Sequence, residues 1–188
     1  MEWVIPAILV IIALWATATH RRLVRLRQAA FDAWPRLEAT LRARHDLLSY
    51  IAQIVLTHAP KEKKLVEAMT AARTAAMKTE LSPNEAGMAE RRLAVAVEHV
   101  TALERTYPDL QANLTFRRLH DQLTKRAEAI AEAREAFNMA ALDFNAAAMG
   151  VPAIFVAKYM NLFMIEYFAL NKEEVAAMRT ARGAKFWA

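Results

Sequence analysis

Apolar residues recur at spacings of three and four along most of this chain, a pattern that predicts amphipathic helices. From Leu23 to Val55 they form one continuous seam of the kind that faces partner helices. Pro35 lies inside this seam and lacks a backbone N–H, so we expect a local bend there. The seam predicts one long first helix.

Three further periodic segments follow. The second covers residues 61–80, and the third begins at Ser82-Pro83-Asn84-Glu85, which has the residues of a helix start with Ser as N-cap and Glu at N3, and runs to about residue 106. The fourth follows Tyr107-Pro108-Asp109 and contains neither proline nor glycine until Gly150. The first and fourth helices are predicted to be about 40 residues, or about 60 Å, long.

An uncharged run precedes the first seam. Residues 3–19 carry no charge, and at 1.5 Å per residue they extend about 26 Å, enough for a thin bilayer. We interpret residues 1–20 as a transmembrane anchor, with Trp3, Ile8, Leu14 and Trp15 in the membrane. The alternative is a cleaved signal peptide, because Ala16-Thr17-Ala18 resembles a cleavage site.

Four arginines and no acidic residue follow the anchor, namely Arg21, Arg22, Arg25 and Arg27. Glu2 alone precedes it. By the positive-inside rule this order predicts a single-pass protein of a cell membrane with its N-terminus outside and its bulk in the cytoplasm. The arginines are then expected to contact anionic lipid headgroups.

The predicted fold class is all-α. A transmembrane helix would continue into a long antiparallel four-helix bundle over residues 21–149. If the first helix leads away from the membrane, the fourth leads back, which places Gly150 and the residues after it on the membrane side. A basic tail, 171–188, ends the chain.

Residues 150–170 are nearly as apolar as the anchor, but Lys158 and Glu166 make a second membrane span costly. On a helical wheel this segment is amphipathic, with an aromatic face of Phe155, Tyr159, Phe163 and Tyr167. Three roles stay open for the segment: closing the end of the bundle, lying on the membrane as an interfacial helix, or forming a contact between subunits.

Composition narrows the function. Three glycines and six prolines among 188 residues are too few for a β-sandwich or barrel, and too few to build a glycine-rich phosphate loop. The absence of cysteine excludes disulfides and Cys-ligated metals. The net charge of +5 comes from the two ends, because residues 28–170 hold as many acidic as basic side chains, so nucleic acid is not an expected partner.

Few residues offer chemistry. None of the five histidines has the H-E-x-x-H or Glu-x-x-His spacing of a metal site, so no metal, cofactor or catalytic residue is predicted. Asp46 and Arg134 lie beside the seams of the two long helices, and we expect them to pair between the helices and fix their register. Asn113, Asn138 and Asn145 are expected to form structural hydrogen bonds.

The chain resembles the LemA family of bacterial membrane proteins, from the anchor to about residue 170. Residues 107–113, Tyr-Pro-Asp-Leu-Gln-Ala-Asn, are similar to that family's YPDLKAN motif, and Phe116 follows. Further matches are Arg44-His45-Asp46-Leu47-Leu48, then Ala133-Arg134, Phe137-Asn138 and Phe144-Asn145, then Val151-Pro152 and Tyr167-Phe168. Leu114, Phe137, Phe144, Ser49 and Tyr50 depart from the family pattern. The resemblance implies one N-terminal span and a cytoplasmic helical bundle, and it supplies no catalytic residue.

The leading functional hypothesis is a non-enzymatic, membrane-tethered scaffold that assembles into a homo-oligomer or docks a protein partner. The alternative is an accessory or regulatory subunit of another membrane complex, such as a membrane peptidase or a membrane-remodelling assembly. An enzyme acting on a membrane substrate is disfavoured, because it would need a cluster of polar groups beyond Asp46 and Arg134.

Overall fold

The computed structural model describes residues 3–169, 174–178 and 180, and these contain helices and turns but no strand. The all-α prediction is therefore confirmed for this part of the chain. The helices are α1 (Val4–His58), α2 (Lys63–Ala76), α3 (Pro83–Ala102), α4 (Pro108–Ala112), α5 (Leu114–Met149) and α6 (Ala153–Tyr159), and the 3-10 turns are η1 (Pro60–Glu62) and η2 (Leu103–Arg105).

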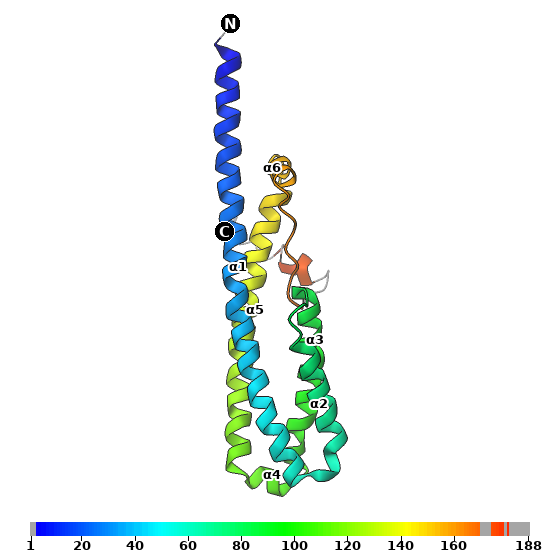
Figure 1. Cartoon of the computed structure of the whole chain (residues 1–188). Coiled ribbons are helices and arrows are strands. Elements are labelled where there is room, and N and C mark those ends of the chain that lie inside the picture. Colours follow the sequence, from blue (N-terminus) through cyan, green and yellow to red (C-terminus); the bar gives the residue numbers. More distant parts are fainter. Residues whose placement is uncertain (1–2, 170–173, 179, 181–188) are drawn as a thin grey trace.

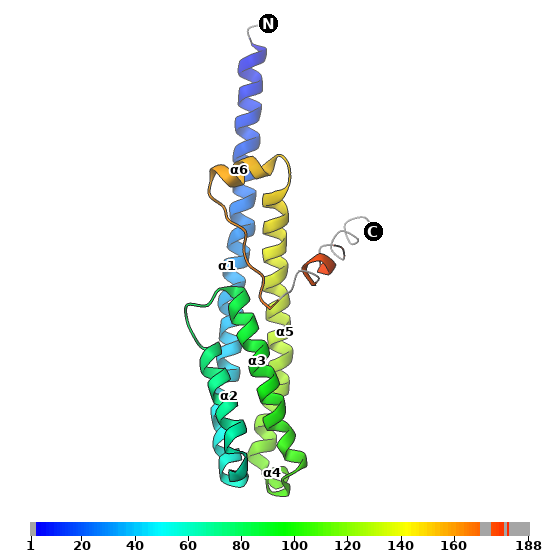
Figure 2. The ribbon, with the colours of Figure 1, turned by 90° about the vertical axis from the view of Figure 1, so that its right-hand side faces the viewer.

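The long helices run side by side in alternating directions (Figures 1 and 2). The chain follows α1 away from the N-terminus, returns along α2, reverses again along α3, turns through α4 and returns along α5. α1 packs mainly against α5, and α2 packs mainly against α3. The end of α5 therefore lies beside the first half of α1, far from the turn at α4.

The helices α1, α2, α3, α4 and α5 share one hydrophobic core at the end of the molecule where α4 lies. Its buried side chains come from these five helices and from Ala59, which follows α1. They are Leu48, Ile51 and Val55 of α1, Val66 and Met69 of α2, Leu93 and Val100 of α3, Leu110 of α4, and Phe116 and Leu123 of α5. Further periodic residues are buried in two other clusters nearer the anchor, with Leu37 and Phe137 in one and Leu23 and Phe144 in the other, as the helical seams predict.

Side-chain caps explain where α3 and α5 begin. The Ser82 Oγ accepts from the Glu85 N–H at 3.4 Å, and the Glu85 Oε2 accepts from the Ser82 N–H at 2.9 Å. This confirms the predicted helix start. At α5 the Asn113 Oδ1 accepts from the Phe116 N–H at 2.9 Å. Asn113 therefore begins the long return helix.

α1 is a single helix of 55 residues that continues through Pro35. Only its apolar beginning projects beyond every other described element (Figure 1), because Leu23 is already buried against α5 and α6. α1 contains a window of 18 residues, with a mean hydropathy of 1.6, that is long and apolar enough to cross a membrane, and none of that window is buried in the protein. The predicted long apolar N-terminal helix is confirmed.

The amphipathic helix predicted for residues 150–170 is wrong. Only α6, of seven residues, is helical there, and it is bent by 101° from α5. Asn161 has a φ of 51°, a left-handed value that ends the helix. Residues 160–169, called here the strap, then run back along the body (Figure 2). An extended chain covers about 3.3 Å per residue against 1.5 Å in a helix, so it can reach buried sites that a helix of equal length cannot.

Candidate functional site

The predicted anchor residues lie on the projecting part of α1. Trp3, Ile8, Leu14 and Trp15 are all exposed, and together they form an apolar surface that no described residue covers. Indole rings near the ends of such a segment favour the headgroup region of a bilayer. The first turns of α1 are therefore compatible with a membrane anchor, as predicted.

The four predicted headgroup-binding arginines do not share one environment. Arg21, Arg22 and Arg25 are exposed on α1, just after the apolar segment. Arg27 is partly buried, and its guanidinium lies 5.1 Å from the centre of the Phe31 ring in a cation–π contact. The first three side chains are thus free to reach lipid phosphates, whereas Arg27 packs on its own helix.

Two asparagines of α5 hold the strap by its backbone. The Asn138 Nδ2 donates to the Phe168 carbonyl at 3.1 Å, and the Phe168 N–H donates to the Asn138 Oδ1 at 2.8 Å. Asn145 does the same for Ile165, at 2.8 and 2.9 Å. Each side-chain amide therefore pairs with one backbone N–H and one backbone carbonyl of the strap, as the backbone of a neighbouring β-strand would.

The spacing of these asparagines matches the spacing of the strap. Seven residues of helix between Asn138 and Asn145 rise about 10.5 Å, and three extended residues between Ile165 and Phe168 cover about 10 Å. The two amides thus act in register on a segment that runs antiparallel to α5. Both asparagines are buried. Their contacts are structural hydrogen bonds, as predicted.

The end of the strap is buried against α1, α3 and α5. The Phe168 ring lies 6.2 Å from the Trp34 ring, which in turn lies 5.1 Å from the Phe137 ring. The Arg91 guanidinium of α3 donates to the Ala169 carbonyl at 2.5 Å and pairs with Glu174 at 3.1 Å. The strap is therefore an integral part of the body that ties α3 to α5.

The four aromatic residues predicted to lie on one helical face do not lie on a common helix. Phe155 and Tyr159 lie on α6, whereas Phe163 and Tyr167 lie on the strap. The side chains of Phe155, Tyr159 and Phe163 are 70%, 86% and 76% exposed. Tyr167 is only partly exposed, and its hydroxyl is buried. The helical-wheel argument failed because the helix ends at Tyr159.

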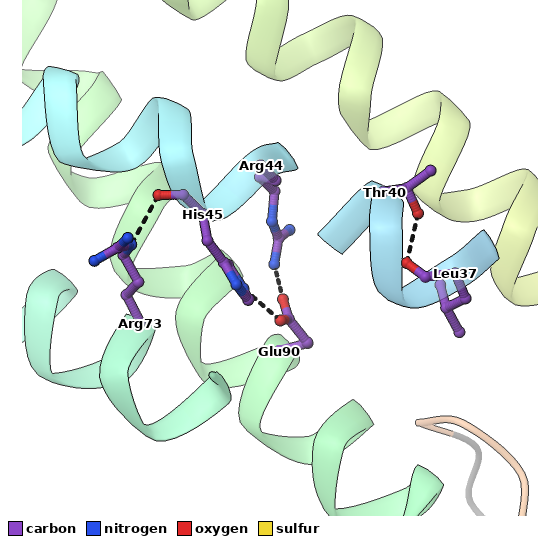
Figure 3. Close-up of polar contacts among 6 residues, drawn as sticks. All are labelled: Leu37, Thr40, Arg44, His45, Arg73 and Glu90. Carbon is purple, nitrogen blue, oxygen red and sulfur yellow. Dashed lines mark hydrogen bonds and ion pairs between the residues drawn. The ribbon is translucent and has the colours of Figure 1, made fainter. Parts of the chain in front are cut away.

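A buried charged cluster joins α1 to α3 (Figure 3). The Glu90 carboxylate of α3 accepts from the Arg44 guanidinium and lies 2.7 Å from the His45 Nε2, both from α1. The Arg73 Nε of α2 donates to the His45 carbonyl at 2.7 Å. Because His45 and Glu90 are both buried, this cluster fixes the register of α1 against α3.

The predicted pair of Asp46 and Arg134 is wrong. Both side chains are exposed, and the structure records no ion pair between them among the residues it describes. Arg44 and His45, immediately before Asp46, supply the interhelical contact instead, and their acidic partner is Glu90. Sequence reasoning overlooked Glu90 because it neighbours the apolar seam residue Ala89 and has no motif around it.

Tyr107 and Asn113 of the Tyr-Pro-Asp-Leu-Gln-Ala-Asn motif make contacts with the preceding turn. The Tyr107 hydroxyl donates to the Glu62 carboxylate at 2.9 Å, and this hydrogen bond raises the pKa of Tyr107 above its usual value. The Asn113 amide lies 3.0 Å from the His58 Nε2. The motif therefore fastens the turn around α4 to the end of α1.

Within the described ranges, no group of three or more His, Cys, Asp or Glu side chains is placed to hold a metal ion. The polar contacts described above serve helix caps, the strap, the turn around α4 and the α1–α3 cluster.

The comparisons with known proteins point to one family. A family model described as LemA family matches residues 33–181. This range includes the α1–α3 cluster, the turn around α4, the asparagines of α5 and the strap. No curated protein matches the chain in sequence.

Proposed function

This chain belongs to the LemA family, and we propose that it is a non-enzymatic helical scaffold, tethered to a bacterial cell membrane, that assembles with copies of itself. Its body would be a four-helix bundle in the cytoplasm, its N-terminus would lie outside, and α1 would cross the bilayer. The arginines that follow the apolar segment support this orientation.

One observation carries the self-assembly proposal: large apolar side chains are exposed at the anchor end of the body. Apart from α1, these are Met149 at the end of α5, Val151, Ile154, Phe155 and Tyr159 in and just before α6, and Met160, Phe163 and Met164 of the strap. Clustered exposed apolar groups mark interaction surfaces on soluble domains. A second copy, held at the same height by its own anchor, is the partner that is always present.

The test of self-assembly is the mass of the purified full-length protein in mild detergent, measured by light scattering. Phe155→Ser and Phe163→Ser, made together, should reduce the mass to that of one chain and leave the helical content unchanged. Leu114→Ser is the matched control, because Leu114 is 77% exposed but lies at the opposite end of the body. This control should keep the wild-type mass.

A wild-type protein that runs as a single chain in several detergents would contradict self-assembly. It would favour the alternative, an accessory or regulatory subunit of another membrane complex, and the exposed aromatic groups would then be the docking surface for that complex. Crosslinking in native membranes separates the two, because self-assembly gives multiples of the chain mass.

The orientation is tested separately. A reporter that works only in the cytoplasm, fused to the C-terminus, should be active. A reporter that works only outside should be inactive at the same point. The opposite result would overturn the orientation, and a mature N-terminus near residue 19 would overturn the assignment of α1 as an anchor.

A further inference from the structure

A groove of about 690 Å³ lies between α1 and the junction of α5 with α6. Its walls are Trp15, Thr19, Leu23 and Leu26 on α1, and Ala146 and Ala147 on α5. This volume is in the range of pockets that hold small organic ligands. Residues 150–153, at the junction of α5 and α6, also line it.

The groove straddles the border of the predicted membrane segment. Trp15 lies inside the uncharged run of 3–19, whereas Leu26 lies about 10 Å beyond its end, at 1.5 Å per residue. α6 is turned 101° from α5 and lies across α1 (Figure 2), so it follows the plane of a membrane that α1 crosses. A ligand in the groove would therefore reach both the hydrocarbon and the headgroup layer.

Two charged side chains line this groove, Arg22 of α1 and Asp143 of α5. Arg22 is exposed and follows Trp15 by two helical turns on the same face of α1. Arg21 and Arg25 lie on another side of α1, together with His20 and Val24. Of the arginines that follow the anchor, Arg22 is thus the one that faces the groove.

We propose that this groove binds one membrane glycerophospholipid, with its phosphate at Arg22 and its acyl chains against Trp15 and the apolar surface of α1 beyond it. A guanidinium pairs well with a phosphate, and the apolar walls match the glycerol and upper chain region. The inference rests on the proposed role of α1 as an anchor, which puts bilayer lipid at this height.

The experiment is native mass spectrometry of the full-length protein in mild detergent, titrated with phosphatidylglycerol and, separately, with diacylglycerol. The wild type should retain one phospholipid per chain and much less diacylglycerol, which lacks the phosphate. Arg22→Gln should lower phospholipid retention about fivefold, the equivalent of about 1 kcal/mol for one arginine at a lipid surface, to the level of diacylglycerol.

A second variant tests the walls of the groove. Ala146 is exposed and lines it, so Ala146→Trp fills the space without entering the core and should lower the retention of both lipids. Matched controls are Arg36→Gln, an exposed arginine of α1 outside the groove lining, and Ala136→Trp, on an exposed position of α5 outside the groove lining. Both controls should bind lipid as the wild type does.

Three results would overturn the proposal: no lipid retained by the wild type, equal retention of phospholipid and diacylglycerol, or equal losses in the variants and their controls. Failure of the anchor itself looks different, because the protein would then be absent from the membrane fraction of cells before any lipid is added.

Discussion

Gly87 of α3 leaves the space in which the backbone of Ala169 lies. A methyl group added at Gly87 would stand 2.6 Å from the Ala169 Cα and closer still to its nitrogen. Ala169 is itself buried, so it has no room to move aside while the strap stays docked. The absence of a side chain at this position of α3 is therefore a condition for docking of the strap.

Gly87→Ala should release the end of the strap. In a free helix this change is favourable by about 1 kcal/mol, but here the methyl group collides with the Ala169 backbone. We expect a net loss of about 1–3 kcal/mol, typical of overpacking, and faster proteolytic cleavage within residues 160–169.

Gly150→Ala is the matched control for this variant. A methyl group at Gly150 would meet its nearest neighbour, the Ala146 carbonyl, at 3.6 Å, which is ordinary contact. The control should keep the wild-type rate of cleavage. Equal protease resistance of the two alanine variants would mean that the strap does not depend on the space at Gly87.

Asn138→Ala should weaken the strap at one of the two asparagines that hold its backbone. It removes two hydrogen bonds and leaves the buried N–H and carbonyl of Phe168 without partners. The expected loss is about 2–6 kcal/mol, from two buried polar groups at about 1–3 kcal/mol each. The measurements are the unfolding free energy and the hydrogen exchange rate of the Phe168 amide, which should rise.

The exposed Asn84 provides the comparison for Asn138. Asn84→Ala should leave the Phe168 exchange rate unchanged, whereas Asn138→Asp, which keeps the acceptor and loses the donor, should lie between Asn138→Ala and the wild type. Unchanged exchange at Phe168 in Asn138→Ala would refute the role of this amide in holding the strap.

The sequence predicts the helices well because their causes are local. The Ser82 cap, the periodic seams and the uncharged run of residues 3–19 each act within a few residues, and α3 begins where the cap predicts. The turn at Asn113 follows the same logic, since its capping partner is Phe116.

The strap and the charged cluster could not be predicted in this way, because the residues that form their contacts are far apart in the sequence. Residues 160–169 are apolar enough for a helix, and they become extended because Asn138 and Asn145, 20–30 residues earlier, supply their backbone hydrogen bonds. The one available signal was the seven-residue spacing of these asparagines, which puts both on one face of α5.

In the alkaline range, the stability of the Tyr107→Phe variant should depend less on pH than that of the wild type. Hydrogen bonding to Glu62 raises the pKa of Tyr107, so the neutral hydroxyl favours the folded state. This stabilisation is complete below about pH 10, the usual tyrosine pKa, and is lost as the pH rises through the higher folded-state value. Tyr107→Phe should melt below the wild type at pH 8, and the gap should close in strong alkali.

The comparison for this variant is Tyr159→Phe, because Tyr159 is almost fully exposed. It should melt as the wild type does at both pH values. A gap between Tyr107→Phe and the wild type that stays constant up to strong alkali would show that the contact with Glu62 does not control this titration.

Glu90→Ala should be strongly destabilising. It leaves Arg44 and His45 of α1 largely buried without their shared carboxylate, and removal of one partner from a buried ion pair costs about 3–5 kcal/mol. Glu38→Ala is the comparison, because it removes an exposed ion pair with Arg42 that contributes at most about 1 kcal/mol to stability. Both losses are read from urea unfolding of the full chain in detergent.

A double replacement separates a positioning role from simple packing. Arg44→Met together with Glu90→Leu removes both charges and keeps apolar volume, so it should cost less than the sum of the two single changes. Crosslinking between cysteines introduced on α1 and α3 then reports register. If Glu90 sets the register, the double variant should be stable yet crosslink at shifted positions, whereas unchanged crosslinks would leave Glu90 with a packing role alone.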